Sequence, residues 1–169
     1  MSDKVVSKPI GFYDMMKEKF VVVDNEVVEL VNLGSAMFQS YVTSLDFYSG
    51  DHYCQSVSYD LPDGICFEQI KHWSYHEKML VPFVWPEAKI RLKVWSNKKR
   101  IVGNILDEVC ENTGRLLEEI VLDKKTIMHG LRKIKENEPD LWLDLKNEPN
   151  GPEAEGIAQI IAYGEWIWG

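Results

Sequence analysis

The sequence predicts an α+β fold, in which an antiparallel sheet from the N-terminal half is packed by helices from the C-terminal half. Two observations predict this arrangement. Residues 89–95 alternate charged and bulky side chains with the period of two that a half-buried strand requires. In residues 124–136 the apolar side chains instead recur at the spacing of an amphipathic helix. The 169 residues therefore divide into mainly strands over 1–95 and mainly helices over 96–169, and the length suits a single domain.

Hairpins account for most of the expected first half. β-branched runs on both sides of Asp24-Asn25 predict a hairpin with a two-residue turn. A second hairpin is expected around Pro62 and Gly64, because proline presets φ and glycine can take a positive φ. Residues 79–85 are apolar enough for a further strand. With the strand over 89–95, an antiparallel meander is expected over about residues 55–95.

Helical spacing and capping residues predict the elements of the second half. A short helix is also expected between Pro9 and Phe20. Asp123 is expected to cap one of the later helices, and Pro139 to mark the end of that helix. The expected later helices cover residues 96–114, residues 116–122, residues 124–136 and a segment that begins at Pro152.

Composition limits the class of protein. The apolar runs are far shorter than the roughly 20 residues of a membrane span, and no secretory signal is recognised at the N-terminus. Three cysteines with no CxxC pair argue against a disulfide framework. A formal net charge of −8 disfavours loose binding of the whole molecule to nucleic acid or to anionic membranes. We therefore expect a cytoplasmic protein without a membrane partner.

The charge is distributed unevenly along the chain. Residues 1–85 carry 6 basic and 12 acidic side chains, residues 86–135 carry 12 and 7, and residues 136–169 carry 1 and 8. Six basic residues open the middle segment and are expected to bind an acidic protein surface or phosphates. They are Lys89, Arg91, Lys93, Lys98, Lys99 and Arg100. The alternative is a solvated strand face with no binding role.

Residues 116–134 resemble the helix-turn-helix motif, in which a recognition helix enters the DNA major groove. The resemblance implies that six residues of the second helix face DNA, with the charged ones mostly on phosphates. They are Lys124, Lys125, Thr126, His129, Arg132 and Lys133. The alternative is a pair of amphipathic helices that pack on the sheet, with charged outer faces exposed to water.

Five of the seven histidines and cysteines fall within 25 residues, namely His52, Cys54, Cys66, His72 and His76. His72 and His76 are four residues apart and would share one face of a helix, which suits two ligands of a zinc ion. His52 and Cys54 are the other candidate ligands. The same group offers a thiol nucleophile and an imidazole base. The alternative is that these histidines are solvent-facing or satisfied by hydrogen bonds, and that no metal is bound.

No P-loop, G-x-S-x-G, G-x-G-x-x-G, H-E-x-x-H or kinase signature occurs in the sequence, which favours a binding protein over an enzyme. We expect a regulatory protein without a cofactor that acts through a protein partner; an inhibitor encoded by a mobile element would be one example. Two alternatives stay open: a helix-turn-helix DNA-binding regulator, with nucleic acid bound through residues 86–135, and a zinc-dependent or Cys/His-dependent enzyme. The sequence makes no prediction of oligomeric state.

Overall fold

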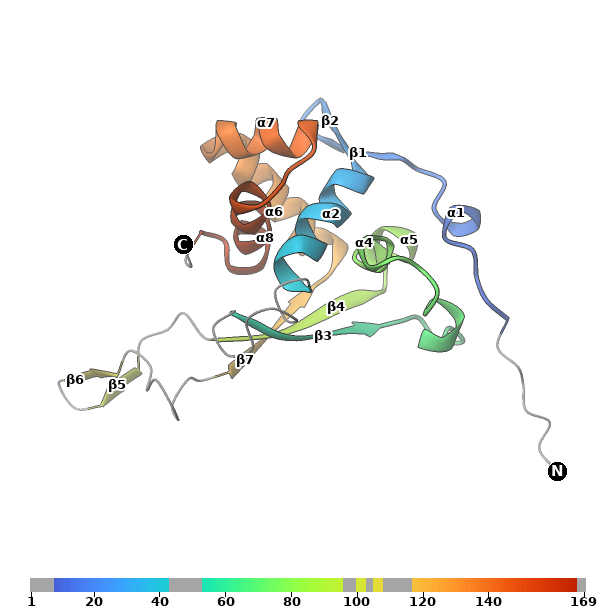
Figure 1. Cartoon of the computed structure of the whole chain (residues 1–169), viewed down its shortest axis with the longest axis horizontal. Helices are drawn as coiled ribbons and strands as arrows, with labels where there is room; N and C mark the ends of the chain where they lie inside the picture. Colours follow the sequence, from blue (N-terminus) through green and yellow to red (C-terminus); the bar gives the residue numbers. More distant parts are fainter. Residues whose placement is uncertain (1–7, 43–52, 96–99, 103–104, 108–116, 167–169) are drawn as a thin grey trace.

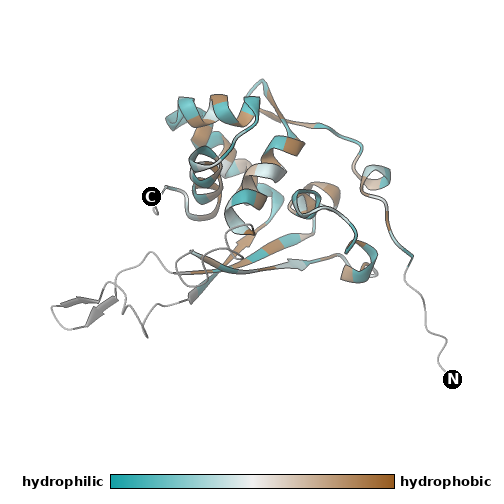
Figure 2. Cartoon of the chain, in the orientation of Figure 1, coloured by the Kyte–Doolittle hydropathy of each residue, from teal (hydrophilic) through white to brown (hydrophobic). Residues whose placement is uncertain are grey.

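The computed structural model describes residues 8–42, 53–95, 100–102, 105–107 and 117–166. Its elements are antiparallel sheets and helices, so the predicted α+β class is confirmed. A three-stranded sheet lies under a layer of helices, and the helices that pack on it lie on one side of it (Figure 1). Hydrophilic and hydrophobic residues alternate along the helices and strands, as expected for elements with one buried face (Figure 2).

The main sheet has the strand order β3-β4-β7, with β4 in the centre and both pairs antiparallel. Its strands are β3 (Cys54–Asp60), β4 (Lys89–Trp95) and β7 (Leu117–Leu122). The alternation predicted for β4 is confirmed, because Ile90, Leu92 and Val94 are fully buried beneath the helices. The charged residues between them therefore face the other side of the sheet, opposite the helices.

Strand β7 corrects the helix that was expected over residues 116–122. It pairs with β4 in the register Leu92↔Ile120 and Ile90↔Leu122, which places apolar side chains on the core face at a period of two. A stretch as short as residues 117–122 fits the apolar spacing of a helix as well as that of a strand. Pairing with the open edge of β4 selects the strand. The first helix of the proposed helix-turn-helix is therefore a strand, and the resemblance to that motif was wrong.

The ribbon formed by β1 (Phe20–Val23) and β2 (Glu26–Glu29) confirms the first predicted hairpin. Asp24 and Asn25 both have positive φ, 44° and 73°, which is the backbone of the two-residue turn that matches strand twist. Val23 and Val28 are buried on the inner face of this ribbon. The ribbon thus contributes to the core without joining the main sheet.

Residues 61–85 differ most from expectation. The turn is present, with Gly64 at φ 88°, but the chain continues into the 3₁₀ helix η1 (Phe67–Gln69) and forms no second strand. The strand expected over 79–85 is replaced by α4 (Tyr75–Lys78) and α5 (Val81–Val84). A short buried apolar run does not distinguish strand from helix, and here a capping box at Ser74 initiates the helical conformation.

Four longer helices complete the fold. Asp123 caps one of them as predicted, since its carboxylate accepts a hydrogen bond from the Thr126 N–H at 2.7 Å. Pro139 begins a further helix that was not expected, instead of only ending the previous one. The longer helices are α2 (Leu30–Tyr41), α6 (Lys124–Asn137), α7 (Pro139–Asn147) and α8 (Pro152–Tyr163). The division at residue 95 is therefore less sharp than expected, because α2 comes from the first half and β7 from the second.

Two further expectations needed correction. The N-terminal helix α1 (Phe12–Met15) has one turn only. Where a helix was expected over 96–114, the described residues form the strands β5 (Arg100–Val102) and β6 (Ile105–Asp107), which pair with each other. In the part of the chain that the structure describes, no helix has the length and apolar character needed to cross a membrane.

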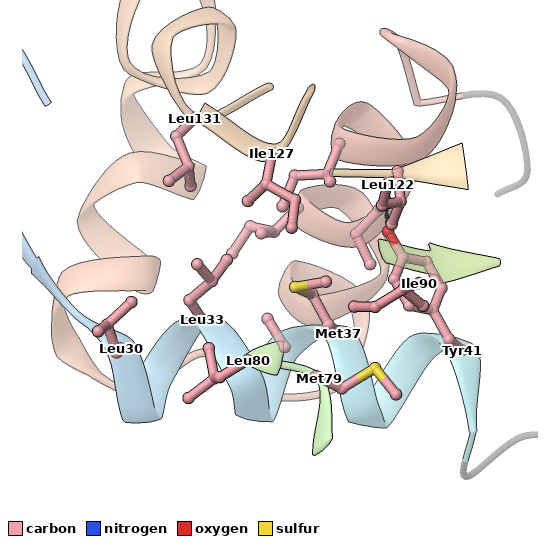
Figure 3. Close-up of a cluster of buried hydrophobic side chains, with 14 of the residues drawn as sticks. Leu30, Leu33, Met37, Tyr41, Met79, Leu80, Ile90, Leu122, Ile127 and Leu131 are labelled. Carbon is pink, nitrogen blue, oxygen red and sulfur yellow. Dashed lines mark hydrogen bonds between the residues drawn. The ribbon is translucent and has the colours of Figure 1, made fainter. Parts of the chain in front are cut away.

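The core lies between the sheet and the helices. Figure 3 shows Met37 and Tyr41 of α2 beside Ile90 and Leu122 of the sheet, and Leu33 of α2 on the side of α6. These five side chains are fully buried, and Ile127 and Leu131 of α6 close the cluster from above. Because β7 runs directly into α6, the pairing of β7 with β4 also fixes where the outer face of α6 lies.

Candidate functional site

The open face of the main sheet carries the first half of the predicted basic band. Lys89, Arg91 and Lys93 alternate with the buried residues of β4 and therefore share this face. Arg91, however, is paired on both sides: its Nε donates to Asp60 at 2.6 Å, and its Nη1 donates to the Glu119 carboxylate. Two carboxylates on the neighbouring strands thus compensate the central charge of the band.

The second half of the basic band is not assembled with the first. Lys98 and Lys99 lie outside the described residues, and Arg100 belongs to β5, which is part of a different sheet from β4. A helix was expected to present these residues, but Arg100 lies in a strand. The described part of the band therefore consists of the β4 residues alone.

The outer face of α6 carries a second group of basic residues. Lys124, Lys125, His129 and Arg132 are exposed, and no described carboxylate forms an ion pair with any of them. In contrast, Lys135 of the same helix lies 3.3 Å from Glu26. Lys124 does contact an aromatic ring, because its Nζ lies 5.8 Å from the centre of Phe83.

The other two residues predicted on this face have different roles. Thr126 is half-buried and donates its backbone N–H to the Asp123 cap. Lys133 is half-buried as well, and its Nζ donates to the carbonyl oxygen of Gly164 at 3.4 Å. Both residues thus stabilise the fold at the ends of α6 and α8.

The β4 strand and α6 meet at Asp123. The hydrogen bond from the Thr126 N–H is the main cause that lowers the pKa of Asp123, and the positive charge of Lys89 adds to the effect. A shallow pocket of about 390 Å³ lies beside this point. Its lining residues are Pro86, Asp123, Lys124, Lys125, Met128 and Arg132.

We call Lys89, Lys124, Lys125, His129 and Arg132 the cationic surface. Sequence reasoning identified each of these residues, but assigned them to two separate elements. The pocket gathers Lys124, Lys125 and Arg132 of α6, and Lys89 of β4 is close enough to Asp123 for its charge to lower the pKa of that carboxyl. The pocket residues Pro86 and Met128 were not predicted as site residues, because neither carries a charge.

The described members of the predicted histidine and cysteine cluster lie in different environments. Cys54 is buried in β3, Cys66 is exposed, and His52 lies outside the described residues. His72 precedes α4, which begins at Tyr75, so His72 and His76 do not share a helix face as expected. Within the described ranges, no three side chains among His, Cys, Asp and Glu are grouped to hold a metal ion.

The Cys54 thiol is also poorly suited to act as a nucleophile. Burial raises its pKa to about 12, so the thiol is protonated at neutral pH. His76 of α4 contacts the Phe38 ring, with ring centres 6.3 Å apart. Cys54 is therefore not a thiolate that His76 activates.

A buried polar network was not anticipated from the sequence. Ser40 of α2 donates its hydroxyl to the Glu155 carboxylate of α8 at 2.9 Å and also bonds to the Tyr53 hydroxyl. Gln159, one helical turn after Glu155, donates to the same carboxylate at 3.2 Å. The network links α2 and α8 to the residue before β3, which gives it an evident structural role.

An apolar groove of about 700 Å³ lies on another part of the molecule. One side is formed by α1 and the residues that follow it to Phe20; the other is formed by the start of α2 and by α4. Among the described residues, six of the ten exposed large hydrophobic side chains lie between residues 13 and 31, and three of the six, Tyr13, Phe20 and Val31, line this groove. The six are Tyr13, Met15, Phe20, Val22, Val27 and Val31.

Comparison with known proteins gives no family. No protein-family model, curated protein sequence or solved structure matches the chain. Function must therefore be inferred from the chemistry of the surfaces themselves. The described residues offer one cationic surface and one apolar groove, and both are suited to binding macromolecules.

Proposed function

We propose that this chain is a binding protein that docks an acidic segment of a partner protein on its cationic surface. The observation that supports this proposal is the grouping of Lys124, Lys125 and Arg132 on the exposed face of α6, without an ion-pair partner among the described residues, in a chain of net charge −8. Because acidic residues outnumber basic ones in this chain, a basic side chain placed at random would usually lie near a carboxylate and form an ion pair. Here Lys125, His129 and Arg132 instead form a continuous stripe at helical spacing.

Helix stability does not explain the position of these charges. Lys124 and Lys125 occupy the first turn of α6, where positive charge opposes the helix macrodipole. Acidic residues are the stabilising choice at this end of a helix, and only the Asp123 cap follows that rule. The Lys124 ammonium lies over the Phe83 ring, 5.8 Å from its centre. For Lys125 a binding role gives a reason that the contacts within the described fold do not supply.

The surroundings of the cationic surface favour a short acidic protein segment over nucleic acid. Exposed Glu87 follows Pro86 at the pocket, and exposed Glu136 continues the stripe on α6 one turn after Arg132. A phosphate backbone that extends beyond the surface would approach these carboxylates. A short segment with acidic residues around one apolar side chain fits better, because Pro86 and Met128 give the pocket an apolar lining.

The test is capture of partners by the tagged full-length chain from the native cell, with a charge-reversed variant beside the wild type. Lys125→Glu combined with Arg132→Glu should abolish capture of a specific protein. The matched control is Lys8→Glu combined with Lys71→Glu, which changes the net charge equally at exposed positions outside the surface. Loss of capture in both variants, or in neither, contradicts the proposal.

Nucleic acid is distinguished by the same preparation and by a direct measurement. The ratio of absorbance at 260 nm to absorbance at 280 nm of the captured material should be that of protein without nucleic acid. Fluorescence anisotropy with duplex DNA at low salt should detect no binding. If DNA binds, with an affinity that falls steeply with salt and a slope that Lys125→Ala plus Arg132→Ala flattens, a DNA-binding role replaces the proposed one.

A further inference from the structure

We propose that the chain forms a two-fold symmetric homodimer in which the apolar groove of each copy receives the α1 side of the second copy. This inference concerns a different surface from the cationic one and does not depend on the proposed function. Three observations support it: the grouping of exposed apolar side chains, the protrusion of Tyr13 beside the groove, and the distribution of charge on the two sides of the groove.

The exposed apolar side chains form a continuous surface. Val22 pairs with Val27 across the β1–β2 ribbon, and Phe20 lies two residues before Val22 on the same outer face. Phe20 also lines the groove, together with Val31 at the start of α2. All four residues are between 47% and 60% exposed. The outer face of the ribbon thus leads directly into the groove.

Tyr13 is the most exposed large hydrophobic residue of the described chain, at 77%. Its ring packs edge-on against Phe12, which holds it at the groove margin instead of in the core. Under two-fold symmetry, the Tyr13 ring of one copy enters the groove of the other, and the reverse contact forms at the same time. A rigid aromatic side chain that fills a pocket is a typical anchor of a protein interface.

The size of the apolar surface is suitable for such an interface. Monomeric proteins rarely expose contiguous apolar patches larger than a few hundred Å². Six large side chains at the observed exposures give a patch of that order. A standard interface buries roughly 800 Å² on each partner, so these side chains would form its apolar centre and the surrounding polar residues its rim.

The charges on the two sides of the groove argue for a second copy as the occupant. Of the residues that line the groove, Lys17, Glu18 and Lys19 after α1 have a net charge of +1, whereas Glu29 and Glu77 on the opposite side have a net charge of −2. Asp14 of α1 does not line the groove. A two-fold axis places the α1 side of each copy against the acidic side of the other. Lys17 of each copy then lies opposite Glu29 of the other, so the same contact forms twice in one interface. The charges of the surface thus complement those of a second copy of the same surface.

The first experiment measures the mass of the full-length chain in solution, by light scattering after gel filtration, from micromolar concentration to the highest soluble one. The wild type should reach twice the mass of one chain, and Tyr13→Ala should shift the midpoint to at least tenfold higher concentration. Circular dichroism should show an unchanged fold, because the Tyr13 side chain is exposed. A wild type that stays monomeric at every concentration overturns the proposal, including the case in which the groove binds another protein.

The second experiment tests the assigned contact by exchanging charges. Lys17→Glu alone places two acidic groups together at each contact, Glu29→Lys alone places two basic groups together, and both variants should be monomeric. An equimolar mixture of the two should form a heterodimer, because each contact then joins opposite charges. Lys125→Glu, outside the groove, should dimerise like the wild type. Two monomeric variants that fail to associate when mixed, or a control that is also monomeric, contradict the proposed interface.

Discussion

Gly130 of α6 lies against Ile161 of α8 so closely that a β-carbon added to Gly130 would lie 2.7 Å from the Ile161 Cα atom. This contact explains a residue that is unfavourable by local criteria. Glycine inside a helix costs about 1 kcal/mol relative to alanine. The close approach of the two helix backbones requires it here, because any side chain would separate α6 from α8.

Gly130→Ala should therefore destabilise the protein although alanine is the better helix former. Overpacking of this kind costs roughly 1–3 kcal/mol, which exceeds the gain of about 1 kcal/mol in helix propensity. Urea unfolding followed by circular dichroism measures the difference. His129→Ala, on the exposed face one residue earlier, is the control and should stay within about 0.5 kcal/mol of the wild type. Equal or greater stability of Gly130→Ala would show that the helices are farther apart.

The carboxylate of Glu26 ties the β1–β2 ribbon to α6 and α7. Its Oε1 accepts hydrogen bonds from Lys146 Nζ at 2.8 Å and from Trp142 Nε1 at 3.2 Å, and Lys135 Nζ lies 3.3 Å from its Oε2. These interactions lower the pKa of Glu26 from 4.5 to about 2, with the hydrogen bond from Lys146 as the largest cause.

The pH dependence of stability should report this carboxylate. Because the folded-state pKa is depressed, Glu26 stabilises the fold above about pH 4.5, and its contribution is lost as the pH falls toward about 2. The difference in unfolding midpoint between the wild type and Glu26→Gln should be largest near neutral pH and shrink over that window. Glu136→Gln, at an exposed position, should show no such trend. A constant difference at all pH values would mean that the charge of Glu26 contributes nothing.

Local signals in the sequence predicted several elements correctly. Asp24-Asn25 predicted the ribbon turn, because few residue pairs tolerate two consecutive positive φ angles. The alternation of β4 and the Asp123 cap of α6 were equally reliable, since each depends on residues close together in the chain. These elements also place most of the cationic surface, which is why its residues could be identified before the structure was known.

Elements decided by distant contacts could not be predicted. β7 became a strand because it pairs with β4, which precedes it by more than twenty residues. Residues 79–85 became helical because an apolar run buried on all sides carries no distinguishing period. The apolar groove has no signature in the sequence for a similar reason: it combines α1, the start of α2 and α4, which only the tertiary fold brings together.

The two described cysteines should differ sharply in reactivity. Cys66 is exposed, whereas Cys54 is buried with its pKa raised to about 12. Alkylation of the native protein at pH 8, followed by peptide mapping, should modify Cys66 within minutes and leave Cys54 unmodified until denaturant is added. Rapid modification of Cys54 in the native state would indicate an accessible thiolate and would favour the Cys/His-dependent enzyme that the structure does not support.

Asp123 allows stability and binding to be separated. Its side chain caps α6, so Asp123→Ala should lower the free energy of unfolding by about 1 kcal/mol, whereas Asp123→Asn keeps a capping oxygen and should lower it less. Both variants remove the one carboxylate of the pocket beside Lys124 and Lys125. Both should therefore bind a captured acidic partner more tightly than the wild type, although one of them is clearly less stable.

The control for this separation is Asp144→Asn, which makes the same change in net charge on α7, away from the cationic surface. Stability is measured by urea unfolding, and affinity by titration of the captured partner at fixed ionic strength. Tighter binding by all three variants would reflect net charge alone, whereas tighter binding by the two Asp123 variants only would locate the partner at the α6 pocket. Weaker binding by Asp123→Asn would mean that the carboxylate itself contacts the partner, and the partner would then be basic at that point.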